Sequence, residues 1–97
     1  MQKFVIKSPE LNGYFARIDQ IGDSVDAAIT DEKYEAKIFD YAIEAKEWLK
    51  KIASENMQYK KTFPKDIVIN WEIVLVNMKN GVNDFDEVMT WYSTTEM

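Results

Sequence analysis

Residues 40–56 read DYAIEAKEWLKKIASEN, and this stretch decides the fold. Its apolar residues recur at helical spacing, at Ala42, Ala45, Leu49 and Ile52, while charged residues take most of the remaining circumference. Asp40 stands where an N-cap carboxylate accepts hydrogen bonds from the free amides of the first turn. A helix with one apolar stripe needs a surface on which to bury it, and the rest of the sequence favours a sheet.

Alternating and β-branched runs on both sides of this helix predict the sheet. We expect strands at residues 1–7, 14–19, 25–30 and 67–78. The first two are separated by the turn signals Ser8-Pro9 and Asn12-Gly13. Strict alternation places Tyr14, Ala16 and Ile18 on one face of the second strand.

Residues 67–78 form the strongest strand pattern in the chain. Trp71, Ile73 and Leu75 share its fully apolar face, which we expect to lie against the helix, and Val74 and Val76 share the other face. The second face is only half apolar, because it also carries Asn70 and Glu72, and a strand of this kind suits a central position in the sheet.

The C-terminal segment is open to two interpretations. Phe85, Val88, Met89 and Tyr92 match helical spacing, but the Val, Thr, Trp and Tyr content favours a strand over residues 87–94, paired with residues 67–78. In such a strand, alternation places Trp91 and Tyr92 on opposite faces. We therefore predict a single α+β domain over residues 1–97: an antiparallel sheet of four to five strands with one long helix packed on one face.

Composition excludes several kinds of chemistry. The chain has 97 residues and contains neither cysteine nor histidine, so it lacks disulfides, thiolate nucleophiles, the commonest general base and the commonest transition-metal ligand. Its glycines are isolated and form no phosphate-binding loop. We expect no enzymatic activity, no cofactor and no metal. No apolar run reaches the length of a signal peptide core or a membrane span, so we expect a cytoplasmic protein without membrane contact.

The net charge of −5 is unevenly distributed. Residues 1–65 carry 11 acids and 11 bases, whereas residues 66–97 carry six acids and one base. Two acidic clusters are the candidate partner-binding residues: Asp19, Asp23, Asp26, Asp31 and Glu32 in the first, and Asp84, Asp86 and Glu87, with Trp91 as an aromatic anchor, in the second. Carboxylates spaced along a surface engage Lys and Arg groups that otherwise grip phosphate. The alternative interpretation is an ordinary solvated surface.

Two other binding modes are less well supported. The first acidic cluster lacks the alternating oxygen ligands and central glycine of a calcium loop. Six lysines between residues 46 and 65, with Tyr59 and Phe63 among them, have the composition of a nucleic-acid contact. However, the chain is acidic overall and Arg17 is its only arginine, so we expect no direct binding of nucleic acid.

Five short segments carry a resemblance: residues 4–7 (FVIK), 13–15 (GYF), 29–31 (ITD), 36–39 (AKIF) and 45–49 (AKEWL). In this order the chain resembles small proteins of phages and mobile elements of low-GC bacteria. The resemblance implies an inhibitor of a host defence nuclease, of the kind that includes anti-CRISPR proteins. The expected partner is then a host protein with a basic groove, met in the cytoplasm of the host bacterium. The alternative is a structural or regulatory domain that self-associates, as a homodimer, through a sheet edge or an exposed aromatic patch.

Overall fold

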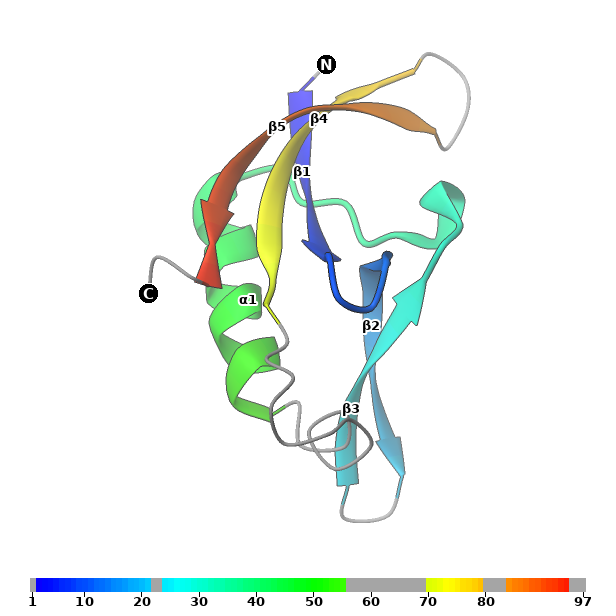
Figure 1. Cartoon of the computed structure of the whole chain (residues 1–97), viewed down its shortest axis with the longest axis vertical. Coiled ribbons are helices and arrows are strands. Elements are labelled where there is room, and N and C mark those ends of the chain that lie inside the picture. Colours follow the sequence, from blue (N-terminus) through cyan, green and yellow to red (C-terminus); the bar gives the residue numbers. More distant parts are fainter. Residues whose placement is uncertain (1, 22–23, 56–69, 80–83, 95–97) are drawn as a thin grey trace.

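The computed structural model describes residues 2–21, 24–55, 70–79 and 84–94, with the side chains at 20, 21, 24–26 and 53–55 left out. The described elements are β1 (Gln2–Ser8), β2 (Gly13–Ile21), β3 (Ser24–Thr30), the short 3-10 helix η1 (Lys33–Glu35), α1 (Ala42–Glu55), β4 (Glu72–Met78) and β5 (Phe85–Ser93). The strands form one antiparallel sheet in the order β3-β2-β1-β4-β5, and α1 packs on one face of it (Figure 1). The predicted α+β class, the helix and the C-terminal strand are confirmed. The predicted basic connection at residues 57–65 and the start of the strand at 67–69 lie outside the described residues.

Strand β1 is the centre of the sheet. It pairs with β4 from Gln2 to Lys7, but with β2 only at Lys7 and Ser8. Where β2 diverges from β1, the segment before the helix takes its place: Phe4 N–H donates to the Phe39 carbonyl at 2.9 Å, and Phe39 N–H donates to the Phe4 carbonyl at 2.8 Å. Lys37 N–H donates to the Phe15 carbonyl of β2 at 3.0 Å. These bonds give hydrogen-bond partners to backbone N–H and C=O groups of β1 and β2 that the divergence of the two strands leaves without a neighbouring strand.

The turn into β2 needs its glycine. Asn12 has a φ of 52°, which places it in the left-handed region that asparagine tolerates well. A Cβ on Gly13 would lie 2.4 Å from Cγ2 of Ile29 and 3.0 Å from the carbonyl oxygen of Thr30. The Asn-Gly signal therefore serves both a left-handed turn and a close approach between β2 and β3.

The helix begins one residue later than an Asp40 cap requires. The Tyr41 carbonyl accepts the hydrogen bond from Ala45 N–H at 3.3 Å, so Tyr41 occupies the N-cap position. The prediction for Asp40 is wrong: its carboxylate instead forms an ion pair with Lys3 at 2.6 Å, tying the helix entrance to β1. The predicted stripe is confirmed for Ala45, Leu49 and Ile52, which are all fully buried or nearly so, whereas Ala42 at the start of the helix is half-buried.

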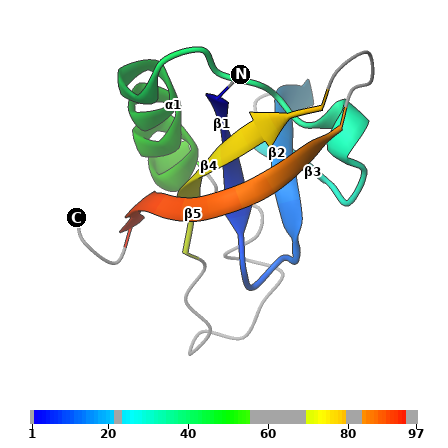
Figure 2. The ribbon, with the colours of Figure 1, turned by 90° about the horizontal axis from the view of Figure 1, so that it is seen from above.

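The sheet has an apolar cluster on each face. The helix side buries Ile6 of β1, Phe15 of β2, Phe39, and Trp71 and Ile73 with the helix stripe. The opposite side buries a second set, namely Val5, Tyr14, Ala36, Val74, Val76 and Phe85. The two predicted faces around β4 are thus confirmed for Trp71, Ile73, Val74 and Val76. Figure 2 shows why the second face is covered: β5 curves across the end of the sheet towards η1.

Three bulges break the alternation that the sequence predicts. In β2 the register steps from Phe15 to Arg17 against consecutive residues of β3, so Ala16 is the extra residue. Tyr14 consequently packs in one cluster and Ile18 against the other, and the predicted shared face is wrong. In β5 the register skips Val88 and Trp91. The Trp91 and Tyr92 rings therefore lie 6.2 Å apart rather than on opposite faces.

No helix among the described residues is long and apolar enough to span a bilayer.

Candidate functional site

The two edges of the sheet approach one another beside η1. Lys33 of η1, which follows edge strand β3, donates through Nζ to the Phe85 carbonyl of the other edge strand at 2.8 Å. Its ammonium also lies 5.3 Å from the centre of the Phe85 ring. Asp31 and Glu32 consequently line the same open hollow as Asp84, a space of about 380 Å³. Acids more than 50 residues apart in sequence thus meet at one place.

Asp84 is the most firmly held carboxylate of this group. Phe85 N–H donates to it at 2.8 Å, and Lys79 and Lys33 lie 3.3 and 3.7 Å from its oxygens. The backbone hydrogen bond is the main reason why the pKa of Asp84 lies below its ordinary value, and Lys79 and Lys33 lower it further despite partial desolvation. Hydrogen bonding to Asp84 in turn raises the pKa of Lys79. Both groups therefore stay charged at neutral pH.

Around Asp84 the carboxylates outnumber the lysines. Asp31 and Glu32 are exposed and have no ion-pair partner among the described residues. Glu35 accepts a hydrogen bond from the Thr30 hydroxyl at 2.8 Å, and Asp86, 69% exposed, lies 3.5 Å from Lys79. We call this set the acidic surface; its members are Asp31, Glu32, Glu35, Asp84 and Asp86, with Lys33 and Lys79 among them. It keeps a net negative charge.

Glu87 follows Asp86 in β5 but belongs to a different group. Its carboxylate accepts hydrogen bonds from the Tyr14 hydroxyl at 2.8 Å and from Lys7 Nζ at 3.0 Å. Burial alone would raise the pKa of Glu87, but the bonds from Tyr14 and Lys7 and the nearby lysine charges outweigh it, so its pKa lies below the ordinary value. The pKa of Tyr14 is strongly raised, first by its own burial and then by Glu87. Glu87 is therefore engaged by Tyr14 and Lys7 of its own chain, although its side chain stays partly exposed.

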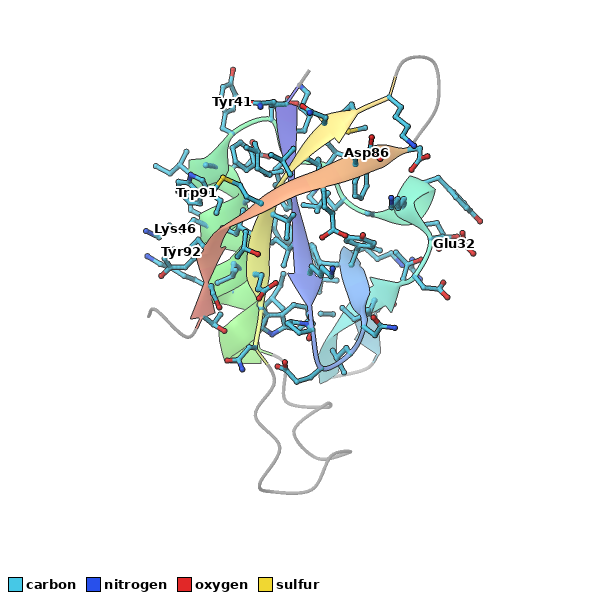
Figure 3. All side chains as sticks on the ribbon, turned by 45° about the horizontal axis from the view of Figure 1, so that its top comes forward. Glu32, Tyr41, Lys46, Asp86, Trp91 and Tyr92 are labelled. Carbon is cyan, nitrogen blue, oxygen red and sulfur yellow. The ribbon has the colours of Figure 1, made fainter. Side chains whose placement is uncertain are left out.

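The other predicted site residues do not join the acidic surface. Asp19 is paired with Arg17 at 2.9 Å and lies opposite Asp26 in the β2–β3 hairpin, at the end of the sheet away from η1 (Figure 1). The side chain of Asp26 and the whole of Asp23 lie outside the described residues. Trp91 packs edge-on against Phe4 at 6.1 Å. Figure 3 shows Glu32 and Asp86 on one side of the molecule, and Trp91 with Tyr92 and Lys46 on the other.

Sequence reasoning missed Glu35 and the two lysines. A signal for Glu35 existed: a single helical turn after Asp31 brings residues three apart, Glu32 and Glu35, to one side. Nothing in the pattern shows that Lys33 and Lys79 converge on Asp84, because the contact depends on how far the sheet curls.

This arrangement suits a surface contact better than a metal. Among the described residues, no cluster of three metal-ligating side chains is arranged to hold an ion. Around Asp84, the ammonium groups of Lys33 and Lys79 already supply the positive charge that a metal ion would bring. In comparisons with known proteins, no family model, curated protein or solved structure matches this chain.

Proposed function

We propose that the chain is a non-catalytic protein-binding module, whose acidic surface occupies a basic groove on a nucleic-acid-binding protein of the host. Inhibition of a host defence nuclease, as anti-CRISPR proteins achieve it, is the form of this function that the sequence resemblance favours. The observation that carries the proposal is the convergence of Asp31, Glu32 and Asp84 around one hollow.

The chemistry of such a contact is the same as that of phosphate binding. A groove lined by Lys and Arg binds phosphates through charge-assisted hydrogen bonds, and carboxylates offer the same kind of acceptor. Asp84 is held by Phe85 N–H and two lysines before any partner arrives, so little side-chain entropy remains to be lost on binding. Asp31 and Glu32 are exposed and free of ion pairs among the described residues, so they can accept lysines or arginines from a partner.

The experiment compares two variants with the same change of charge. Asp31→Lys/Glu32→Lys reverses the free part of the acidic surface. Glu44→Lys/Glu47→Lys makes the same change at exposed positions of α1 and serves as the matched control. Each tagged protein is used to capture nucleic-acid-binding proteins from a bacterial lysate, with the captured proteins quantified by mass spectrometry.

The expected result is that the wild type and the helix control retain the same basic proteins, and that Asp31→Lys/Glu32→Lys loses them. Captured proteins should also be released by competing DNA or RNA and by raising the salt from about 0.15 M to about 1 M, since exposed charge pairs are screened at that concentration. Equal capture by both variants, or capture that neither salt nor nucleic acid reduces, would refute the proposal. Circular dichroism of each variant verifies that it is folded.

A further inference from the structure

A second surface lies on the other side of the molecule and is apolar. On edge strand β5, Met89 is 55% exposed and Trp91 is 44% exposed. Met89 is the pairing partner of Leu75, Leu75 is the partner of Phe4, and the Phe4 ring touches Trp91. These four side chains form one continuous patch over three strands. We call it the β5 patch: Phe4, Leu75, Met89 and Trp91.

The β5 patch ends at an open sheet edge. Strand β5 is the last in the strand order, and its six consecutive residues from Asp86 to Trp91 are exposed. Among the described residues, the strand that pairs with β5 is β4. A long edge strand with exposed apolar side chains is a template for a further strand, unless charge or Pro protects it. Its charged residues, Asp86 and Glu87, lie at one end.

The charges beside the patch are arranged so that the surface complements itself. Asp86 stands near the start of β5, and Tyr92 stands near its end, three residues to either side of Met89. Lys46 of α1 holds its ammonium 4.6 Å from the centre of the Tyr92 ring. Asp86 pairs with Asn77, and Tyr92 pairs with Ile73. Asn77 and Ile73 lie on the face of the sheet that carries the helix, so Asp86 and Tyr92 are on that face as well.

We propose that the occupant of the β5 patch is a second copy of this chain, paired antiparallel through β5 about a twofold axis at Met89. In that register Met89 meets Met89 of the second copy, and Asp86 lies opposite Tyr92 of the second copy, beside its Lys46. Directly opposed residues have Cβ atoms about 5 Å apart, which brings the Asp86 carboxylate within reach of that ammonium. The contact occurs twice by symmetry.

This dimer is expected to be weak and to cover Asp86 but leave the rest of the acidic surface open. The bulges at Val88 and Trp91 shorten the stretch of regular edge, as bulges on natural edge strands do. Pairing therefore covers less than a standard interface, and we expect a dissociation constant in the range of about 10 µM to about 1 mM. The inference is independent of the proposed function, because Asp31 and Glu32 lie outside the contact.

Sedimentation velocity of the full chain over a concentration series tests the proposal with a charge swap. Asp86→Lys and Lys46→Asp should each weaken the dimer about tenfold or more, whereas the double variant Asp86→Lys/Lys46→Asp should recover to within about threefold of the wild type. The recovery has no explanation within one chain, because six residues of strand, about 20 Å, separate Asp86 from Tyr92. Figure 3 shows Asp86 and Lys46 on different sides of the molecule.

Two more variants complete the test. Met89→Lys places two ammonium groups at the axis and should leave a monomer, whereas Asp31→Lys/Glu32→Lys should dimerise like the wild type. A wild type that stays monomeric up to about 1 mM would overturn the proposal. So would a double charge swap without recovery, or a dimer that survives Met89→Lys; the latter would show that another surface associates.

Discussion

Removing the hydroxyl of Tyr14 tests the buried group that joins β1, β2 and β5. The Tyr14 side chain is 7% exposed, its hydroxyl donates to Glu87 at 2.8 Å, and its ring meets Phe85 edge-on at 5.4 Å. Tyr14→Phe keeps the ring and removes only the hydrogen bond. A hydrogen bond to a charged acceptor contributes about 1.5–3 kcal/mol. Because the Glu87 side chain is 35% exposed and keeps Lys7 as a partner, we expect the lower end, a loss of about 1–2 kcal/mol at pH 7.

The difference between the two proteins should depend on pH at both ends of the range. The folded state raises the pKa of Tyr14 above its ordinary value of 10.0. The contribution of Tyr14 is therefore complete below pH 10 and is lost as the pH rises, because the unfolded tyrosine ionises first. At one pH unit above the ordinary pKa of 10.0, the free energy of unfolding of the wild type has fallen by about 1.4 kcal/mol. Its advantage over Tyr14→Phe should therefore nearly vanish by about pH 11.

At the acid end the sign is opposite. The folded state lowers the pKa of Glu87, so the stability that this carboxylate contributes is present above its ordinary pKa of 4.5 and is lost as the pH falls through the folded value. Tyr14→Phe removes one of the bonds that lower this pKa and should lose less stability in acid. The advantage of the wild type is thus a plateau between about pH 5 and pH 9 that declines on both sides.

Urea denaturation of the wild type and Tyr14→Phe at a series of pH values measures this curve directly. Subtracting one free energy of unfolding from the other cancels the contributions of the lysines and the other tyrosines, which both proteins share. Tyr41→Phe is the matched control, because Tyr41 is 68% exposed and its hydroxyl has no partner among the described residues. We expect the control to change stability by no more than about 0.5 kcal/mol at any pH. Parallel curves for the wild type and Tyr14→Phe would refute the reasoning.

Two further changes test how the sheet is held. Phe39→Ala should lower the free energy of unfolding in urea by about 3–5 kcal/mol, because Phe39 is fully buried between β1 and the helix. Tyr34→Ala is the control: Tyr34 is 61% exposed, and its loss should cost less than about 0.5 kcal/mol. Equal losses for the two variants would contradict the buried position of Phe39. Lys33→Met should cost about 1 kcal/mol by removing the hydrogen bond to the Phe85 carbonyl, and should speed amide exchange in β5 more than in β1. Unchanged exchange in β5 would show that η1 does not hold the two sheet edges together.

The fold class was predictable because the periodic signals are strong. The helix stripe of Ala45, Leu49 and Ile52, and the alternation around Trp71 and Ile73, reflect burial that tertiary structure reinforces. The bulges were not predictable, since a single extra residue such as Ala16 leaves no mark on composition but moves every later side chain to the other face. Asp40 was misassigned for a similar reason: a favourable cap residue found a competing partner, Lys3, that is distant in sequence.

The candidate site was predictable only in part. The acidic segments around Asp31 and Asp84 stand out from charge counting, and the structure brings them to one hollow. The sequence contains no indication that Glu87 is bound by Tyr14, or that Trp91 lies on the opposite side, because both follow from the bulges of β5. Local pattern identifies the charged segments, whereas the curl of the sheet decides which of them share a surface.

The position of β1 has a consequence for how the chain is made. The central strand β1 is synthesised before the other described strands, yet most of its pairing partners in the sheet come from β4, with Phe4 beside Leu75. At about 5–20 residues per second, roughly 4 to 14 s pass between these two residues on the ribosome. Until then the apolar stripe of α1 lacks the part of its binding surface that Trp71 and Ile73 provide, so a ribosome stalled before β4 would hold an unfinished domain with exposed apolar surface.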